Sequence, residues 1–162
     1  MSILENPPEN PCFGCGPLHP RGLHLILEED HAADGVHEVR TRFTPKPDEI
    51  GWPGLQHGGL HYFVLHEVSY WAALTLGGKV MRFSGTAQFH QERLPRVGIE
   101  HVARARIAAR EEMGGLAIRA ESRTATDRQC GVLDTHWLPA SRAEVERARL
   151  ALPNYLLEEM DP

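Results

Sequence analysis

The stretch HGGLHYFVLHEVSYWAALTL, residues 57–76, decides the fold because its pattern predicts one long helix. Two glycines lie at its start, and the pair Gly77-Gly78 that follows it is typical of a helix C-terminus. Apolar residues recur at helical spacing on one side, and further apolar residues leave little polar surface elsewhere. A helix that is apolar nearly all round is expected to be buried. Its length would be about 30 Å.

Strand patterns surround this helix on both sides. Alternating apolar residues and turn signals predict two strands before it and four after it, and no second core helix. We also expect a turn at 31–35, a loop at 48–56 and a tight hairpin turn at Gly114-Gly115. One buried helix among many strands predicts the α+β class, with an antiparallel sheet of five or six strands wrapped around a central helix. The predicted strands are 22–29, 36–43, 79–90, 97–110, 115–126 and 130–138.

The chain divides into three predicted segments. Residues 1–22 form a proline-rich N-terminal arm, residues 23–140 form the main domain, and residues 141–162 form a helical tail. The tail is expected to begin with a short exposed helix, with Ser141 as N-cap and Glu144 at the third helical position.

Composition excludes several classes of protein. The net charge of −5 does not favour a nucleic-acid binder, and no apolar run reaches the length of a membrane span. The first eleven residues are polar and lack the basic and apolar regions of a signal peptide. We therefore expect a cytoplasmic protein.

The three cysteines are too few, and odd in number, for a disulfide framework. Cys12 and Cys15 form a CxxC motif, which suggests half a zinc site or a redox pair. No second CxxC and no histidine pair at zinc-finger spacing accompany it. From the sequence we expect Cys12 and Cys15 to be loop cysteines that bind no metal.

Three segments carry a resemblance to a known family. The arm CFGCGPLHPRGLHL (12–25), the stretch GWPGLQHGGLHYFVLHEVSYWAAL (51–74) and the run 80–138, which contains RLPRVG (93–98), resemble hotdog-fold acyl-CoA thioesterases of the phenylacetate-degradation type. The resemblance implies a hotdog domain over 23–140 that hydrolyses an acyl-CoA thioester. It also implies a homodimer or a dimer of dimers, with the helix start of one subunit facing the middle of the partner's helix. Non-catalytic acyl-CoA binding is the alternative, and an acyl-CoA hydratase or dehydratase is a weaker one.

The helix start has the properties of an oxyanion hole. Unpaired N–H groups and the positive end of the helix dipole lie there, and Gly58 and Gly59 let a carbonyl approach closely. The resemblance assigns this role to the same turn. The glycines alternatively serve only the loop-to-helix turn. His57 either holds the loop by a side-chain hydrogen bond or acts directly.

The middle of the helix departs from the family pattern. The family has an Asp nine residues after the HGG histidine, whereas this chain has His66 followed by Glu67. Either His66 or Glu67 is the base, or the site has kept binding and lost hydrolysis; a buried, hydrogen-bonded structural histidine is a further alternative. By a small margin we favour Glu67 as base, since a carboxylate also acts as nucleophile. His66 would then orient the substrate or the attacking water.

The remaining site predictions concern substrate binding. Tyr62, Ser69 and Tyr70 share the polar strip of the helix with His66, so they are candidates for contacts with the substrate, and the strip alternatively suits a contact between subunits. Arg82 and Arg93 are candidates for the phosphates of coenzyme A, for which arginine is well suited. No cofactor is expected beyond the coenzyme A of the substrate, and neither nucleic acid nor a membrane is an expected partner.

Overall fold

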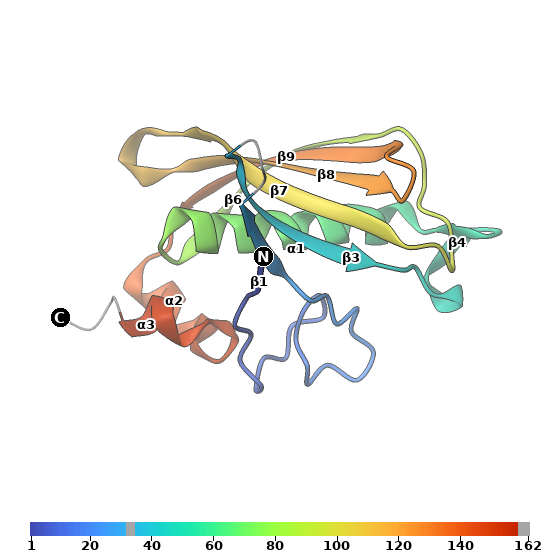
Figure 1. Cartoon of the computed structure of the whole chain (residues 1–162). Helices are drawn as coiled ribbons and strands as arrows, with labels where there is room; N and C mark the ends of the chain where they lie inside the picture. Colours follow the sequence, from blue (N-terminus) through green and yellow to red (C-terminus); the bar gives the residue numbers. More distant parts are fainter. Residues whose placement is uncertain (32–34, 159–162) are drawn as a thin grey trace.

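The computed structural model describes residues 1–31 and 35–158. Seven of the described strands form one antiparallel sheet in the order β1-β2-β3-β7-β8-β9-β6, and β4 pairs with β5 in a separate hairpin (Figure 1). The strands are β1 (Ser2–Ile3), β2 (Glu28–His31), β3 (His37–Phe43), β4 (Ile50–Trp52), β5 (Leu55–Gln56), β6 (Met81–Gln91), β7 (His101–Arg110), β8 (Leu116–Thr124) and β9 (Gln129–Pro139). The helices are α1 (Gly58–Gly77), α2 (Arg142–Ala148) and α3 (Asn154–Glu158), with 3-10 turns η1 (Pro47–Glu49), η2 (Glu112–Gly114) and η3 (Arg149–Ala151).

The predicted central helix is confirmed as α1. His57 is its N-cap, and Gly78 ends it in the left-handed conformation with φ of 67°. Figure 1 shows α1 lying along one face of the sheet, with the N-terminal arm, α2 and α3 beyond it. The buried side chains of α1 include Leu65 and Trp71, which pack in one core with Ile118 and Trp137 of the sheet. The α+β class and the wrapped antiparallel sheet are therefore confirmed.

Most of the predicted strands are present within a few residues of their expected ends. The strand predicted at 22–29 is the exception, because only its last two residues belong to β2. Leu25 and Leu27 are buried, as their alternation indicated. However, the N–H groups of Leu23 and Leu25 donate to Phe13 and Gly14 of the arm, so these residues pair with the arm instead of the sheet.

The connections differ more from expectation than the strands do. The predicted loop 48–56 contains a turn of η1 and the small β4–β5 hairpin. The turn between β7 and β8 is not a tight two-residue hairpin, because η2 lies between the strands and Met113 and Gly114 both have positive φ. The turn expected at 31–35 includes residues 32–34, which lie outside the described part of the chain.

The ends of the chain add elements to the central unit. The arm contributes β1 to the sheet edge, which gives one strand more than predicted. The helix predicted after Ser141 is confirmed as α2, with the complete capping box between Ser141 and Glu144. α3 lies within the segment predicted as a helical tail, and it helps to form a second small core in which Leu156 packs with Leu74 and Leu152. None of the described helices is long and apolar enough to cross a membrane.

Candidate active site

The start of α1 is held by its own N-cap. The N–H of Gly59 donates to Nδ1 of His57 over 3.0 Å, a side-chain hydrogen bond of the kind expected in one of the two alternatives for His57. This bond occupies one of the two proposed oxyanion donors. The N–H of Gly58 makes no hydrogen bond to any residue that the structure describes. Gly58 therefore offers the available donor at the positive end of the helix.

A buried polar network of His61, Gln91 and Ser122 lies next to the start of α1. Gln91 of β6 donates through Nε2 to Nδ1 of His61 (3.1 Å), so Nε2 of His61 carries the ring proton and donates to Oγ of Ser122 (2.6 Å). Burial, with a smaller contribution from His101, lowers the pKa of His61 to about 4, which keeps the ring neutral near pH 7. Oε1 of Gln91 lies 3.1 Å from the position that a Cβ on Gly58 would take, so the network also defines the space beside Gly58. This network could not be predicted from the sequence, because Gln91 and Ser122 lie 30 and 61 positions after His61.

His66 lies among aromatic side chains in the middle of α1. Its ring centroid is 4.9 Å from that of Phe83 on β6 and 5.3 Å from that of Trp137 on β9. Tyr62, one turn earlier, is also in contact at 5.9 Å. Burial lowers the pKa of His66, because the apolar surroundings disfavour the charged ring. The imidazole is therefore neutral near pH 7 and able to accept a proton.

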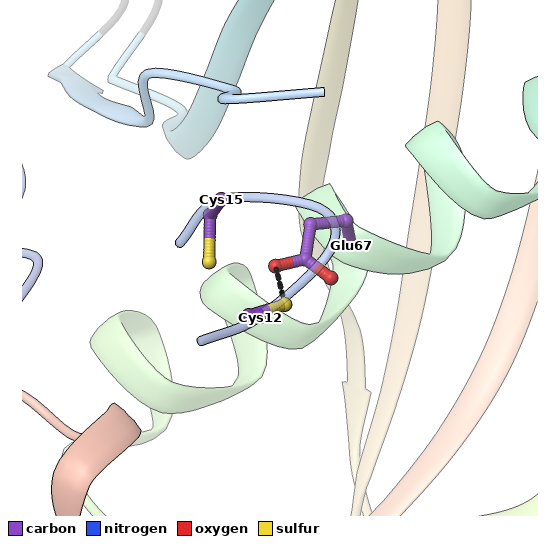
Figure 2. Close-up of side chains that lie close together, drawn as sticks. All are labelled: Cys12, Cys15 and Glu67. Atoms are coloured by element: carbon purple, nitrogen blue, oxygen red, sulfur yellow. Dashed lines mark hydrogen bonds between the residues drawn. The ribbon is translucent and has the colours of Figure 1, made fainter. Parts of the chain in front are cut away.

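Glu67 lies on a different side of α1, under the N-terminal arm. Figure 2 shows its carboxylate next to the arm segment that carries Cys12 and Cys15. Its side chain is 5% exposed, and Sγ of Cys12 lies 3.5 Å from Oε1. Burial raises the pKa of Glu67 to about 7, and the neighbouring Cys12 contributes to the same shift. Its location favours His66 over Glu67 as the group that meets a substrate, contrary to the preference drawn from the sequence.

Two predicted substrate contacts need correction. Ser69 is fully buried and bonded within the core, where its hydroxyl pairs with Thr135 (2.5 Å) and accepts from the indole N–H of Trp137 (3.1 Å). The helical wheel placed Ser69 beside His66, but the sheet covers that position. Arg82 lies at the start of β6, which follows the C-terminal end of α1, and its guanidinium is 3.9 Å from Glu144 of α2. Its location is therefore remote from Gly58.

Tyr62 and Tyr70 remain near the candidate site. Tyr62 contacts both His66 and Phe89, and the ring of Tyr70 lies 5.4 Å from that of Trp137. Both side chains are half-buried. They extend the aromatic surroundings of His66 along α1.

Arg93 lines a groove next to the helix start. The groove has a volume of about 690 Å³, and its apolar wall is connected to the helix start because Leu94 lies 3.6 Å from the Cβ position of Gly58. Nε of Arg93 donates to the carbonyl of Gln129 over 2.6 Å, which fixes the side chain at the groove. Three of the lining side chains are positively charged and three are large aliphatic ones: Arg93, Arg96, Arg128, Leu55, Leu94 and Ile99.

Gly58 and His66 do not meet within one chain. Eight residues separate them on α1, which corresponds to about 12 Å along the axis and to a rotation of roughly 80° around it. A reaction that uses both groups on one carbonyl therefore needs a second copy of the chain.

Comparisons with known proteins agree with this architecture. No family model and no curated protein matches the sequence. Solved structures do match: the thioesterase superfamily protein RHA08564 has a TM-score of 0.68 at 20% identity, over 78% of this chain and 62% of that chain. The Escherichia coli PaaI protein from the phenylacetic acid degradation operon has a TM-score of 0.60 at 10% identity, over 71% of this chain and 80% of that chain.

A third match comes from a structure with a bound ligand. A hypothetical thioesterase of Streptococcus pneumoniae TIGR4, solved with coenzyme A, has a TM-score of 0.60 at 10% identity, over 71% of this chain and 89% of that chain. The present chain spans less than two thirds of RHA08564. At such identities the likeness establishes the fold alone. The hotdog fold that the sequence resemblance predicted is confirmed, and thioesterase superfamily proteins, PaaI among them, share it.

Proposed function

We propose that this protein hydrolyses an acyl-CoA thioester. The observation that carries the proposal is the unpaired N–H of Gly58 at the start of a buried helix, next to a groove lined by three arginines. A thioester carbonyl placed at Gly58 would have a hydrogen-bond donor for its developing oxyanion. The phosphates of coenzyme A would lie among the arginines. The bound coenzyme A of the S. pneumoniae structure supports the same ligand class.

The proposed reaction uses His66 as general base. The neutral imidazole takes a proton from water, and the resulting hydroxide attacks the thioester carbonyl. The oxyanion forms against the N–H of Gly58. When the C–S bond breaks, coenzyme A leaves as the thiolate and is protonated, and the acyl group is released as a carboxylic acid.

Binding without hydrolysis is the second candidate, and one observation favours it. His66 makes no hydrogen bond to any described residue, so nothing within the chain orients its ring as a base. A panel of acyl-CoAs, followed by release of free thiol, separates the two functions. Thiol release supports hydrolysis, whereas saturable binding without release supports the second candidate. A change in acyl unsaturation without thiol release would instead identify a hydratase or dehydratase.

The arginine groove gives a prediction about substrate affinity. Replacing Arg93 or Arg128 by alanine is expected to raise KM for the acyl-CoA about 5- to 10-fold, because each loses one charge-assisted contact to phosphate. The value of kcat should change little. Arg149→Ala, on the surface of the tail, is the control and should leave both constants unchanged. Equal KM values for all three variants would place coenzyme A elsewhere.

We further propose a homodimer or dimer of dimers that pairs along β6. This strand has eleven residues, pairs with β9 on one side and forms the end of the sheet on the other, so its free edge can pair with a second chain. Light scattering is expected to give two or four times the 18.1 kDa of one chain. A monomer at micromolar concentration would contradict both the dimer and the shared site.

Subunit mixing tests the shared site directly. Gly58→Val and His66→Ala homodimers are each expected to be nearly inactive. Random mixing puts half of the chains into heterodimers with one intact site, so about a quarter of wild-type activity should return. No recovery, despite subunit exchange shown by mass spectrometry, would contradict a site built from two chains.

A further inference from the structure

The N-terminal arm brings two cysteines to Glu67, 52 and 55 residues further along the chain. Cys12 and Cys15 lie in a short turn that passes over α1, and Glu67 points into this turn (Figure 2). One ligand atom from each residue lies within 4.8 Å of the other two. The sequence-based expectation that the CxxC motif binds no metal depended on the lack of further ligands. Glu67 is a third potential ligand, which its distance along the chain concealed.

The turn around the cysteines is tightly wound and directs donors at both sulfurs. The N–H of Gly14 donates to Sγ of Cys12 over 3.3 Å, and Nδ2 of Asn10 to Sγ of Cys15 over 3.5 Å. Gly16 closes the turn with a hydrogen bond to the carbonyl of Cys12, and a Cβ on Gly16 would lie 2.3 Å from the carbonyl oxygen of Asn10. The N–H donor aimed at Cys12 favours the thiolate of that residue, which is the form that binds metals, whereas the contact with Cys12 and burial raise the pKa of Cys15.

The cluster holds acidic groups without a cation. Cys15 and Glu67 are each 5% exposed, and no lysine, arginine or histidine forms an ion pair with Glu67 among the described residues. A buried carboxylate without a cation is costly, since charged groups lose hydration on burial. Two thiols do not offset this charge. A bound cation would stabilise the carboxylate and the thiolates together.

We propose that Cys12, Cys15 and Glu67 form a zinc site with water as the fourth ligand. Two sulfurs and one carboxylate oxygen suit a borderline metal such as Zn²⁺, whereas Mg²⁺ and Ca²⁺ prefer oxygen ligands. Zn–S and Zn–O bonds of about 2.3 Å and 2.1 Å at tetrahedral angles place sulfur and oxygen roughly 3.6 Å apart. The distance from Sγ of Cys12 to Oε1 of Glu67 is 3.5 Å, so these two atoms already have the required separation. Binding releases the two thiol protons, and the proton of Glu67 where it is present.

Such a site would fasten the arm to α1 one residue from His66. The arm and the helix are joined here by a weak S–H···O contact between Cys12 and Glu67. Zinc would replace it with three metal–ligand bonds. The site acts on the position of the arm and takes no part in the proposed hydrolysis, so its test is independent of any acyl-CoA.

The test measures metal binding by the full-length, reduced protein. Titration with Co²⁺, a spectroscopic substitute for Zn²⁺, is expected to produce a thiolate-to-cobalt charge-transfer band that saturates at one equivalent per chain. Elemental analysis after zinc loading and dialysis should give the same stoichiometry. Cys12→Ser and Cys15→Ser should lose the band, and Glu67→Gln should weaken zinc affinity at least tenfold. Cys130→Ser, a buried cysteine outside the cluster, is the matched control and should behave as wild type.

The possible results separate the alternatives. Circular dichroism and thermal unfolding confirm that each variant is folded before its affinity is compared. If reduced wild-type protein shows no band and retains no zinc, the proposal is wrong and the pair consists of thiols only. A band of equal strength and affinity in Glu67→Gln would remove Glu67 from the ligand set and overturn the three-ligand site.

Discussion

Replacing His66 by alanine is expected to lower kcat about 100-fold while acyl-CoA binding persists. A general base contributes about 10²–10⁴-fold, and His66 is the titratable group that lies against the aromatic side chains of β6 and β9. Steady-state thiol release gives kcat, and calorimetry with a non-hydrolysable acyl-CoA analogue gives the affinity. His136→Ala, on an exposed histidine paired with Glu111, is the control and should retain full activity.

The pH dependence of the wild type gives an independent test of the same group. The base acts when neutral, so kcat/KM should rise with pH as His66 loses its proton. Burial lowers the pKa of His66 below its ordinary value of 6.5, so the midpoint of the rise should lie below pH 6.5. Full activity of His66→Ala would refute this mechanism. A wild type that binds acyl-CoA and never cleaves it would instead make His66 the explanation for lost hydrolysis.

Glu67→Gln is expected to stabilise the metal-free protein at pH 8 by about 2–3 kcal/mol and to have little effect near pH 4. Burial raises the pKa of Glu67 from 4.5 to about 7 in the folded protein. The stability that this group contributes is thus fully present below pH 4.5 and is lost as pH rises to about 7, because the unfolded chain gives up the proton first. Glutamine does not ionise and avoids this loss.

Urea unfolding at a series of pH values, with a chelator present, measures the difference. Glu146→Gln replaces an exposed glutamate of α2 and should show no such pH dependence. With saturating zinc the sign should reverse, since the ionised carboxylate is then a ligand. A stability difference between wild type and Glu67→Gln that is the same at pH 4 and pH 8 would contradict a carboxyl with a raised pKa.

Local signals in the sequence predict the central helix and most of the sheet. Glycines bracket α1, its apolar residues follow helical spacing, and Ser141 with Glu144 marks the start of α2. The segment 22–29 was predicted as a strand because Leu23, Leu25 and Leu27 recur at every second position. Alternating apolar residues indicate that one side of a segment is buried. They do not indicate which segment forms the backbone hydrogen bonds with it.

The candidate site was predictable only in part. The start of α1 follows from HGG, because an N-cap and its donors are local features. The surroundings of Glu67 depend on an arm 52 to 55 residues away, and those of His61 on Ser122, 61 residues away. The prediction for Ser69 was wrong for a related reason. A helical wheel shows which residues share a side of the helix, but it does not show which side the sheet covers.

The close approach of Gly14 to Glu67 should couple substitutions at these two positions. A Cβ on Gly14 would lie 2.6 Å from the carboxyl carbon of Glu67, so a larger residue at 14 would displace this side chain, and a shorter residue at 67 would relieve the contact. Substitutions at the two positions should therefore be non-additive, with a double change less harmful than the sum of the single ones. Among homologous sequences, residue volume at position 14 should vary inversely with that at position 67. A homologue with alanine at position 14 is expected to have a residue smaller than glutamate at position 67.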